Sequence, residues 1–397
     1  MCEYAFNELC QARPEWTGDD YAFLQAGDMA AFHQALPGYA PTPLRSLPAL
    51  AARLGLAEIL VKDESQRFGI KAFKALGASY AMYRLLKKQW QARFADPFTP
   101  ASFQDRQVLE TLGSFTFCAA TDGNHGRAVA WTARKLGQRA VIYMPADSVP
   151  ARVESIRGEG AEVELVAGTF DLCVERCARD AAKNGWQAIS DTAYPGYGEI
   201  PGWILLGYTS IFVELEGLLH GPMKTGVDTV ILPAGVGGLA AAGAFFYSKR
   251  YGAKRPFLIC VEPVSSDCFL ESVRFGKGEP LPTRGRQTSI MAGLNCGVPS
   301  PLAWPFVRDA YPFFLAVGDR FAEEAMRRYY HPLKGDPRII SGESGSSGLA
   351  ALLALTSVDK LVAIRSKLPL GPTARVLLVN TEGDTDPENF RKTVEAS

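Results

Sequence analysis

The sequence predicts an α/β protein built on mainly parallel sheets. Three observations support this class. Short apolar runs rich in Val, Ile and Phe alternate with helical patterns along almost the whole chain. Several of these runs are apolar at successive positions, as expected of strands covered on both faces. The 397 residues, 47% of them hydrophobic, are enough for two subdomains with sizeable cores.

Each element is predicted from its own pattern. The expected strands are Ile59–Lys62, Thr116–Ala120, Ala140–Tyr143, Val163–Val166, Thr229–Pro233, Phe257–Val261, Phe313–Ala316 and Val376–Val379. The expected helices are Lys74–Trp90, Arg127–Leu136, Leu172–Lys183, Trp203–Leu219, Leu239–Tyr251 and Arg320–Tyr330. This alternation indicates βαβ units and parallel pairing. Polar stretches interrupt it near 91–107, 191–201 and 276–291, and the second is a candidate return from one subdomain to the other.

Charge and targeting signals favour a small-molecule enzyme in the cytoplasm. Forty-two basic residues balance forty-two acidic ones, so neither nucleic acid nor an anionic membrane is expected as a partner. The first 16 residues lack the basic and apolar regions of a secretion signal. The most apolar stretch, 235–247, is too short to span a bilayer.

The eight cysteines do not form a disulfide framework or a metal-binding pattern. Cys173 and Cys177 are four residues apart on a predicted helix, but no histidine or second cysteine pair completes a site, so no metal is expected. Cys268 and Cys296 lie beside loops that we expect at the rim of the active site, which is predicted below from other segments. A disulfide between them is left open.

Four segments lie where a strand ends or a helix begins, which is where α/β sheets place their ligands. Residues 235–238 form a glycine-rich turn whose N–H groups are able to cradle a phosphate. The dinucleotide fingerprint also fits there, as Gly235-x-Gly237-x-x-Ala240 with Glu262 as the acidic residue. A nicotinamide-dependent dehydrogenase is therefore one alternative.

The other three segments each allow a functional and a structural interpretation. Residues 121–126 read TDGNHG, which suits a binding turn or an N-cap equally. Lys74 begins a helix, where it is able to form an imine with a carbonyl cofactor but is more commonly a solvated residue. Residues 380–384 follow the last strand, and their side chains either bond a ring nitrogen or end a turn.

Taken together and in this order, the segments around 74, 121–126, 235–238 and 380–384 resemble the fold-type-II pyridoxal-phosphate (PLP) enzymes, the tryptophan-synthase-β-like family. The resemblance covers roughly residues 41–386. It implies two open, twisted, mainly parallel sheets with helices on both faces, and a cofactor in the cleft between two domains. The large PLP-binding domain would comprise 1–77 and 197–397, and the small inserted domain 78–196.

Within this family the chain is similar to the diaminopropionate ammonia-lyases. That subgroup shares AFK at 72–74, TDGNHGR at 121–127, DTA at 191–193, MAGL at 291–294 and NTEGDTDP at 380–387. Tyr194, Pro195 and Gly202 depart from the expected pattern. The resemblance implies α,β-elimination of D- or L-2,3-diaminopropionate to pyruvate and two ammonia, by a homodimer whose only other partner is this amino acid.

The resemblance also implies the roles of individual residues. Lys74 would carry PLP as a Schiff base and take the α-proton of one enantiomer, and Asp122 would take that of the other. Asp191 would bind the β-ammonium or support Asp122. The expected catalytic residues are thus Lys74, Asp122 and Asp191. The expected cofactor-binding residues are Phe73, Lys74, Asn124, Gly235, Val236, Gly237, Gly238 and Thr381. The expected substrate-binding residues are Thr121, Asp122, Gly123, His125 and Asp191. Glu343 would lie near the cofactor ring or serve as a helix N-terminal acid.

Two further alternatives accompany this interpretation. A serine or threonine dehydratase shares the fold and the cofactor, but Asp122 and the segment around Asp191 argue against it. A PLP-binding protein without turnover is a rival of another class, although every expected chemical group is present.

Overall fold

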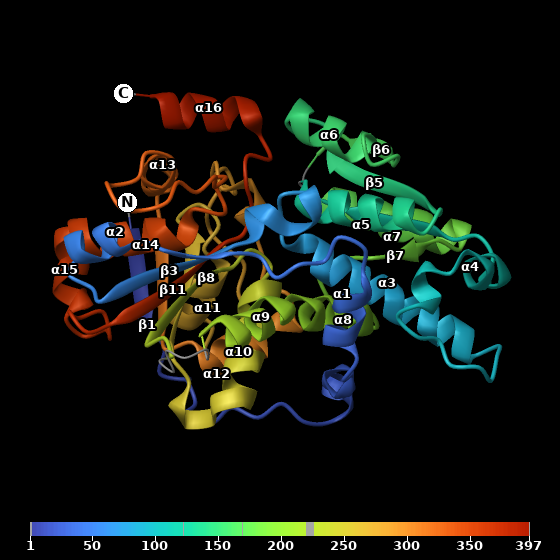
Figure 1. Ribbon diagram of the computed structural model, residues 1–397, viewed down its shortest axis with the longest axis horizontal. Helices are drawn as coiled ribbons and strands as arrows, with labels where there is room; N and C mark the ends of the chain where they lie inside the picture. The colour runs from blue at the N-terminus through green and yellow to red at the C-terminus, as the bar shows by residue number, and fades with distance from the viewer. Residues whose placement is uncertain (1, 122, 169, 220–225, 397) are drawn as a thin grey trace. The chain divides into compact units, whose positions relative to one another are not determined.

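The computed structural model describes residues 2–121, 123–168, 170–219 and 226–396, and Figure 1 shows the elements that they form. The chain packs into two compact units. The first unit comprises Met1–Gly18, Pro41–Gln66 and Ile211–Ser397, and the second comprises Asp19–Ala40 and Arg67–Ser210. Each unit has its own sheet. The division into domains at 78–196 stays a prediction.

The first unit contains a seven-stranded sheet in the order β1-β10-β9-β8-β11-β3-β2. Its strands are β1 (Cys2–Phe6), β2 (Leu44–Ser46), β3 (Glu58–Asp63), β8 (Thr229–Pro233), β9 (Phe257–Pro263), β10 (Phe313–Val317) and β11 (Arg375–Asn380). The five inner strands run parallel, whereas the edge strands β1 and β2 are antiparallel to their neighbours. The inner strands are buried at almost every position, which explains their continuous apolar sequences.

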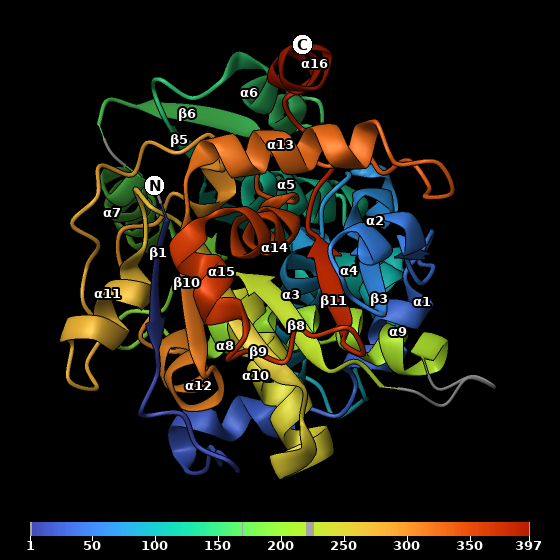
Figure 2. The same ribbon diagram turned by 90° about the vertical axis from the view of Figure 1, so that its left-hand side faces the viewer.

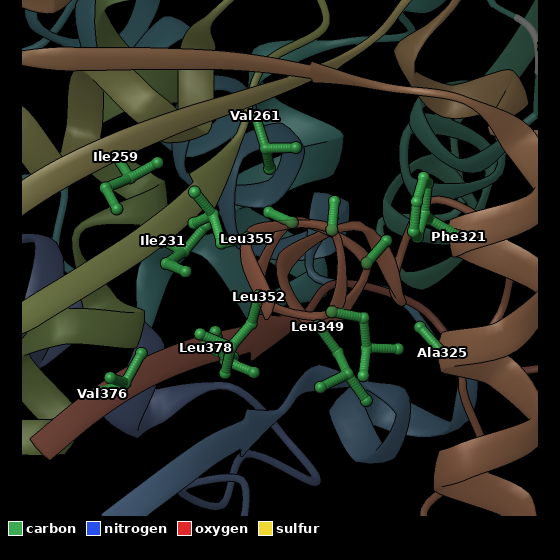
Figure 3. Close-up of a cluster of buried hydrophobic side chains, with 14 of the residues drawn as sticks. Ile231, Ile259, Val261, Phe321, Ala325, Leu349, Leu352, Leu355, Val376 and Leu378 are labelled. Carbon is green, nitrogen blue, oxygen red and sulfur yellow. The ribbon is translucent and has the colours of Figure 1, made fainter. Parts of the chain in front are cut away.

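Helices cover both faces of this sheet. On one face lies α14 (Ser347–Ser357), whose Leu349, Leu352 and Leu355 are fully buried (Figure 3). Their sheet partners include Ile231, Ile259, Val261, Val376 and Leu378. On the opposite face lies α10 (Gly238–Tyr251), where a Cβ added to Gly243 would strike the side chain of Leu232. Each fully buried leucine or isoleucine stabilises the fold by about 1.5–3 kcal/mol.

The second unit contains a four-stranded, fully parallel sheet in the order β6-β5-β4-β7. Its strands are β4 (Thr116–Ala120), β5 (Arg139–Pro145), β6 (Glu162–Val166) and β7 (Gln187–Ala188). Helix α7 (Phe170–Asn184) packs Cys173 and Cys177 against Cys118 on one face, so these two cysteines are core residues. Helix α5 (Asn124–Lys135) lies on the other face, where Gly126 meets Ile142.

Further helices complete the two units. In the first unit they are α2 (Pro48–Arg53), α9 (Ser210–Leu219), α11 (Cys268–Phe275), α12 (Ala303–Ala310), α13 (Asp319–Tyr330), α15 (Asp359–Arg365) and α16 (Pro387–Glu395), and α9 begins at the last residue of the second unit. In the second unit they are α1 (Met29–Ala35), α3 (Lys74–Gln91), α4 (Arg106–Leu112), α6 (Pro150–Arg157) and α8 (Glu199–Tyr208). Short 3₁₀ helices are Asp19–Gln25, Glu64–Gly69, Ser102–Gln104, Gly252–Lys254 and Ala292–Leu294. Figure 2 shows α13 and α15 beside α14.

The predicted fold class is confirmed, and all eight predicted strands are present with ends shifted by at most two residues. One helix prediction was wrong. The expected helix Trp203–Leu219 is two helices, α8 and α9, separated at Thr209, whose hydroxyl donates to the carbonyl of Leu206. This bond satisfies a carbonyl at the end of α8.

One helical stretch among the described residues, Glu199–Leu219, is long and apolar enough to cross a membrane. However, 72% of its apolar window is buried inside the protein, as in the core helix of a globular fold. The pair formed by α14 and α15 passes the same test only jointly, and it is bent by 96°.

Candidate active site

Lys74 lies in an enclosed setting within the second unit. It is the first residue of α3, and its side chain is 19% exposed. Its Nζ donates a hydrogen bond to Asp191 Oδ2 at 2.7 Å. The same nitrogen lies 5.4 and 5.7 Å from the ring centroids of Phe73 and Tyr208. One carboxylate and two aromatic rings thus surround this ammonium, which is not the setting of a solvated surface lysine.

Close packing of α3 against α8 fixes the position of Lys74. A Cβ added to Gly207 would come within 2.5 Å of the Leu76 carbonyl oxygen. A Cβ added to Gly77 would collide with the ring of Tyr208. Two glycines therefore let the helices touch directly, and this contact brings Tyr208 alongside the lysine.

Parallel strand pairing brings Asp191 next to the segment that contains His125. Strands β4 and β7 run parallel, so the segments after them, at 121–126 and 189–191, begin at the same edge of the sheet. Asp191 Oδ2 lies 3.9 Å from Nδ1 of His125. Burial raises the pKa of Asp191, but the charges of Lys74 and His125 and the hydrogen bonds to the carboxylate together outweigh burial and lower that pKa to about 2.

The side chain of Thr121 binds backbone N–H groups at the start of α5. Oγ1 of Thr121 accepts hydrogen bonds from the N–H groups of Gly123 and Gly126, at 2.9 and 3.0 Å. The N-cap of α5 is Gly123, so Thr121 binds the first turn of this helix from outside the N-cap position. Asn124 is the half-buried first residue of that helix. Asp122 lies outside the described residues.

In the first unit, the glycine-rich turn links β8 to α10. Gly237 is the N-cap of α10 with φ of +100°, a conformation that favours glycine. A Cβ on Gly237 would strike Phe269, and one on Gly235 would lie 3.0 Å from the carbonyl oxygen of Gly293. The turn therefore has no room for side chains at two of its four positions. Its consecutive N–H groups and the N-terminus of α10 suit an anion.

Three other predicted segments meet within this unit. Gly293, which packs against Gly235, donates its N–H to Oγ of Ser344 at 3.1 Å. Ser344 in turn donates its N–H to Oε1 of Glu382 at 3.1 Å. The segments 291–294, 341–345 and 380–384 are thus connected by hydrogen bonds although they lie far apart in sequence. Glu343 is 2% exposed and accepts a hydrogen bond from the side chain of Asn389.

Thr381 directly follows β11 and is 5% exposed. Its neighbour Asn380 donates from Nδ2 to Asp63 Oδ1 at 2.9 Å and to the Ile340 carbonyl at 3.0 Å. These bonds tie the end of β11 to the end of β3, so the position of Thr381 is well defined.

Cys268 and Cys296 are free thiols in this structure. Both are near the glycine turn, since Cys268 Sγ lies 4.0 Å from the Gly235 carbonyl and Cys296 Sγ lies 3.1 Å from a Cβ built on Gly235.

A surface cavity of about 650 Å³ along α13, lined by Arg320, Arg327, Arg328 and His331 among others, contains none of the predicted site residues.

Comparison with known proteins settles the family. The model of the family described as "Pyridoxal-phosphate dependent enzyme" matches residues 35–381. The chain belongs to this family. A diaminopropionate ammonia-lyase from Salmonella typhimurium (strain LT2) is 39% identical over 401 residues, covering 99% of this chain and 98% of the relative. A solved structure of diaminopropionate ammonia lyase from Escherichia coli, in complex with D-serine, has a TM-score of 0.89 and 38% identity, covering 99% of this chain and 97% of that one. A serine dehydratase-like protein from Homo sapiens is more distant, at 27% identity over 68% of this chain and 73% of its own length.

These findings confirm the predicted resemblance to the PLP enzymes and, within them, to the diaminopropionate ammonia-lyases. The dehydrogenase alternative accounted for the glycine turn alone, whereas the family match spans all four segments. The residues present also fit PLP. The second unit offers an enclosed lysine, and the first offers a turn whose glycines leave its N–H groups accessible to a phosphate.

Two functional features were not predicted from the sequence. Tyr208 is not among the expected site residues, and its position beside Lys74 depends on the Gly77–Gly207 helix contact. Small residues facing each other on two predicted helices were the available signal. The orientation of the His125 ring depends on the Ile189 carbonyl, for which the sequence has no signal.

Proposed function

We propose that this protein is a PLP-dependent carbon–nitrogen lyase that converts 2,3-diaminopropionate to pyruvate and two ammonia. Its relatives named diaminopropionate ammonia-lyase cover almost the whole chain. The observation that carries the assignment is the 2.7 Å contact between Lys74 and Asp191. It places a carboxylate next to the cofactor lysine, where a substrate with a second ammonium group is able to use it.

The cofactor-binding roles are proposed residue by residue from the family pattern. In the second unit, Lys74 would form the Schiff base, Phe73 would pack near it, and Asn124 would bond the ring hydroxyl. In the first unit, the N–H groups of residues 235–238 would bind the phosphate, and Thr381 would bond the pyridine nitrogen. When bound, PLP supplies an electron sink for the pair left on the substrate Cα. A hydroxyl partner such as Thr381 leaves the pyridine nitrogen largely unprotonated, which suits elimination over transamination.

The protein's own groups would handle protons and orientation. The amine of Lys74, once released, is able to take the α-proton from one face of the substrate. Backbone N–H groups around residues 121–125, at the N-terminus of α5, would bind the substrate carboxylate. The carboxylate of Asp191, which pairs with the Lys74 ammonium in this structure, would accept the β-ammonium of the substrate in its place.

The direct experiment measures pyruvate release from D- and L-2,3-diaminopropionate by the PLP-loaded protein, with L-serine and L-threonine alongside. We expect fast turnover of one or both diaminopropionates and little from the hydroxy amino acids. A preference for serine or threonine would instead establish the dehydratase alternative. No pyruvate from any of the four, with PLP bound, would favour a PLP-binding protein without turnover.

Asp122 is proposed as the base for the second enantiomer. Asp122→Asn removes a proton acceptor while keeping the size of the side chain, so activity on one enantiomer should fall by roughly 100-fold or more. Activity on the other should change much less. Steady-state rates with the separate D and L substrates measure this ratio. Equal losses on both would show that Asp122 has a structural role.

We further propose that the enzyme is a cytoplasmic homodimer that binds neither nucleic acid nor membrane. The balanced charge of the chain supports the absence of an anionic macromolecular partner. Sedimentation equilibrium of the PLP-loaded protein tests the dimer. A mass of 43.1 kDa, that of one chain, would contradict it.

A further inference from the structure

The imidazole of His125 has a defined proton arrangement. The ring is 4% exposed, and its Nε2 lies 2.6 Å from the carbonyl oxygen of Ile189. A carbonyl oxygen only accepts hydrogen bonds, so Nε2 must carry a proton and donate it. Burial lowers the pKa of His125, so the ring is neutral at physiological pH. Its other nitrogen, Nδ1, therefore bears a lone pair.

The nitrogen that bears this lone pair lies near the carboxylate of Asp191. Nδ1 is buried and has no hydrogen-bond partner among the residues that the structure describes. Leaving a buried acceptor unsatisfied costs about 1–3 kcal/mol, which calls for a donor that completes the site. Nδ1 lies 3.9 Å from Oδ2 of Asp191, but a carboxylate and a lone pair cannot bond to each other. The two atoms are therefore neighbouring acceptors, 3.9 Å apart.

A cation with N–H donors is able to bond both acceptors, Nδ1 of His125 and the carboxylate of Asp191. In this structure the Lys74 ammonium is the cation beside Asp191, at 2.7 Å from the same Oδ2. The proposed function assigns Lys74 to the cofactor, so another donor must serve the pair during turnover. The β-ammonium of 2,3-diaminopropionate has three N–H donors and a positive charge, whereas the hydroxyl of serine has one donor and no charge.

We propose that Nδ1 of His125 and the carboxylate of Asp191 jointly accept the substrate's β-ammonium, and that His125 thereby selects diamino acids over hydroxy amino acids. This inference rests on the proposed function and adds a specificity-determining residue to it. The two acceptors keep the β-nitrogen protonated. When the Cβ–N bond breaks, its electron pair stays on that nitrogen, which leaves as neutral ammonia. The pair left on Cα by proton removal becomes the Cα–Cβ double bond, so no extra proton is needed.

Two substitutions separate the ring nitrogens. His125→Gln places an amide near the position of Nε2, so it keeps a donor for Ile189 but has no acceptor facing Asp191. His125→Asn places its amide oxygen near the position of Nδ1, so it keeps the acceptor and gives up the bond to Ile189. A merely structural role for His125 predicts that the variant without the Ile189 bond suffers more.

The measured quantity is kcat/KM for the preferred diaminopropionate divided by kcat/KM for L-serine, using PLP-loaded protein. A hydrogen bond to a charged group is worth about 1.5–3 kcal/mol, so H125Q should lower this ratio roughly 10- to 100-fold, mainly through the KM of diaminopropionate. H125N should retain the ratio within a few-fold. An unchanged ratio in H125Q, or an equal fall in both variants, would overturn the proposal.

A measurement independent of activity tests the proton arrangement. ¹⁵N NMR of the imidazole in the PLP-loaded protein without substrate should show a neutral ring with the proton on Nε2. A proton on Nδ1, or a doubly protonated ring near pH 7, would contradict the proposal even if neither variant folds. If the unmodified enzyme does not turn over diaminopropionate, the proposed function fails first, and the NMR result still reports on His125 alone.

Discussion

Lys62 and Lys74 each pair with a carboxylate, and the difference between their surroundings separates a structural ion network from a candidate catalytic group. Lys62, at the end of β3, is 0% exposed and fully partnered. Its Nζ donates to Glu214 Oε2 at 2.5 Å and to the Thr42 carbonyl at 2.7 Å, with Glu64 3.9 Å away. Lys74 is partly exposed, and next to its carboxylate partner lies an imidazole nitrogen without a hydrogen bond among the described residues.

The comparison teaches that burial and an ion pair do not identify a functional lysine. Breaking a buried pair destabilises a protein, so the Lys62 network supports the first unit by holding residue 42, β3 and α9 together. Among the described residues, the surroundings of Lys74 include two aromatic rings, the Asp191 carboxylate and, beside it, a buried nitrogen of His125 that has no hydrogen bond. An incomplete polar site is the kind that a cofactor and a substrate complete.

The largest expected effect is the loss of cofactor attachment and activity when Lys74 is replaced, which should not occur when Lys62 is replaced. Lys74→Ala should remove the visible absorbance of the lysine-bound cofactor and lower kcat by roughly 1,000-fold or more, since both the covalent attachment and a proton acceptor are lost. Absorbance spectra after PLP loading, with circular dichroism to check folding, measure this. A Lys74→Ala protein with an unchanged spectrum would disprove the assignment of Lys74.

Lys62→Met should lower the stability of the fold but leave cofactor binding intact. Removing the cation leaves Glu214 and Glu64 buried near each other, so the free energy of unfolding should fall by about 3–5 kcal/mol. The folded fraction should still show the cofactor absorbance. Urea unfolding and PLP titration of the same preparation measure both quantities. Loss of the absorbance in a stably folded Lys62→Met protein would mean that the two lysines have been assigned the wrong roles.

A smaller effect on the free energy of unfolding is expected at acid pH, where Asp191, the partner of Lys74, becomes protonated. Because the pKa of Asp191 is about 2 in the folded protein against an ordinary 3.8, its ionised form stabilises the fold. This contribution, about 2 kcal/mol, is present above pH 4 and is lost as the pH falls towards 2.

Asp191→Asn should therefore flatten the pH dependence of the free energy of unfolding between pH 4 and 2, measured on the cofactor-free protein by denaturant titration. Asp147→Asn, at an exposed position, is the control. Equal slopes for the unmodified protein and the Asp191 variant would show that the Lys74–Asp191 pair is not stabilising.

Much of the fold was predictable because the inner strands are buried on both faces and so have uninterrupted apolar sequences. Strands β1, β2 and β7 were not predicted. They have five, three and two residues, and the first two are antiparallel edges, so no apolar run marks them. Their positions depend on pairing with distant strands, which is a tertiary effect.

The site was predictable as a set of segments but not as a set of contacts. The order of the Lys74, 121–126, glycine-turn and 380–384 segments pointed to the correct family. However, the consecutive charges at 62–64 favoured exposed side chains, and only the Glu214 and Thr42 contacts explain their burial. Likewise, Asp191 is 117 residues from Lys74. The two meet because β4 and β7 pair in parallel and α3 packs against α5, the helix that follows β4.

The most direct test of the difference between the two lysines is borohydride reduction of the PLP-loaded protein, followed by peptide mapping by mass spectrometry. Reduction fixes the Schiff base as a stable pyridoxyl-lysine. We expect the label on the peptide containing Lys74, at close to one per chain, and no label on Lys62. A label on any other lysine, or none in a protein that binds PLP, would contradict this expectation.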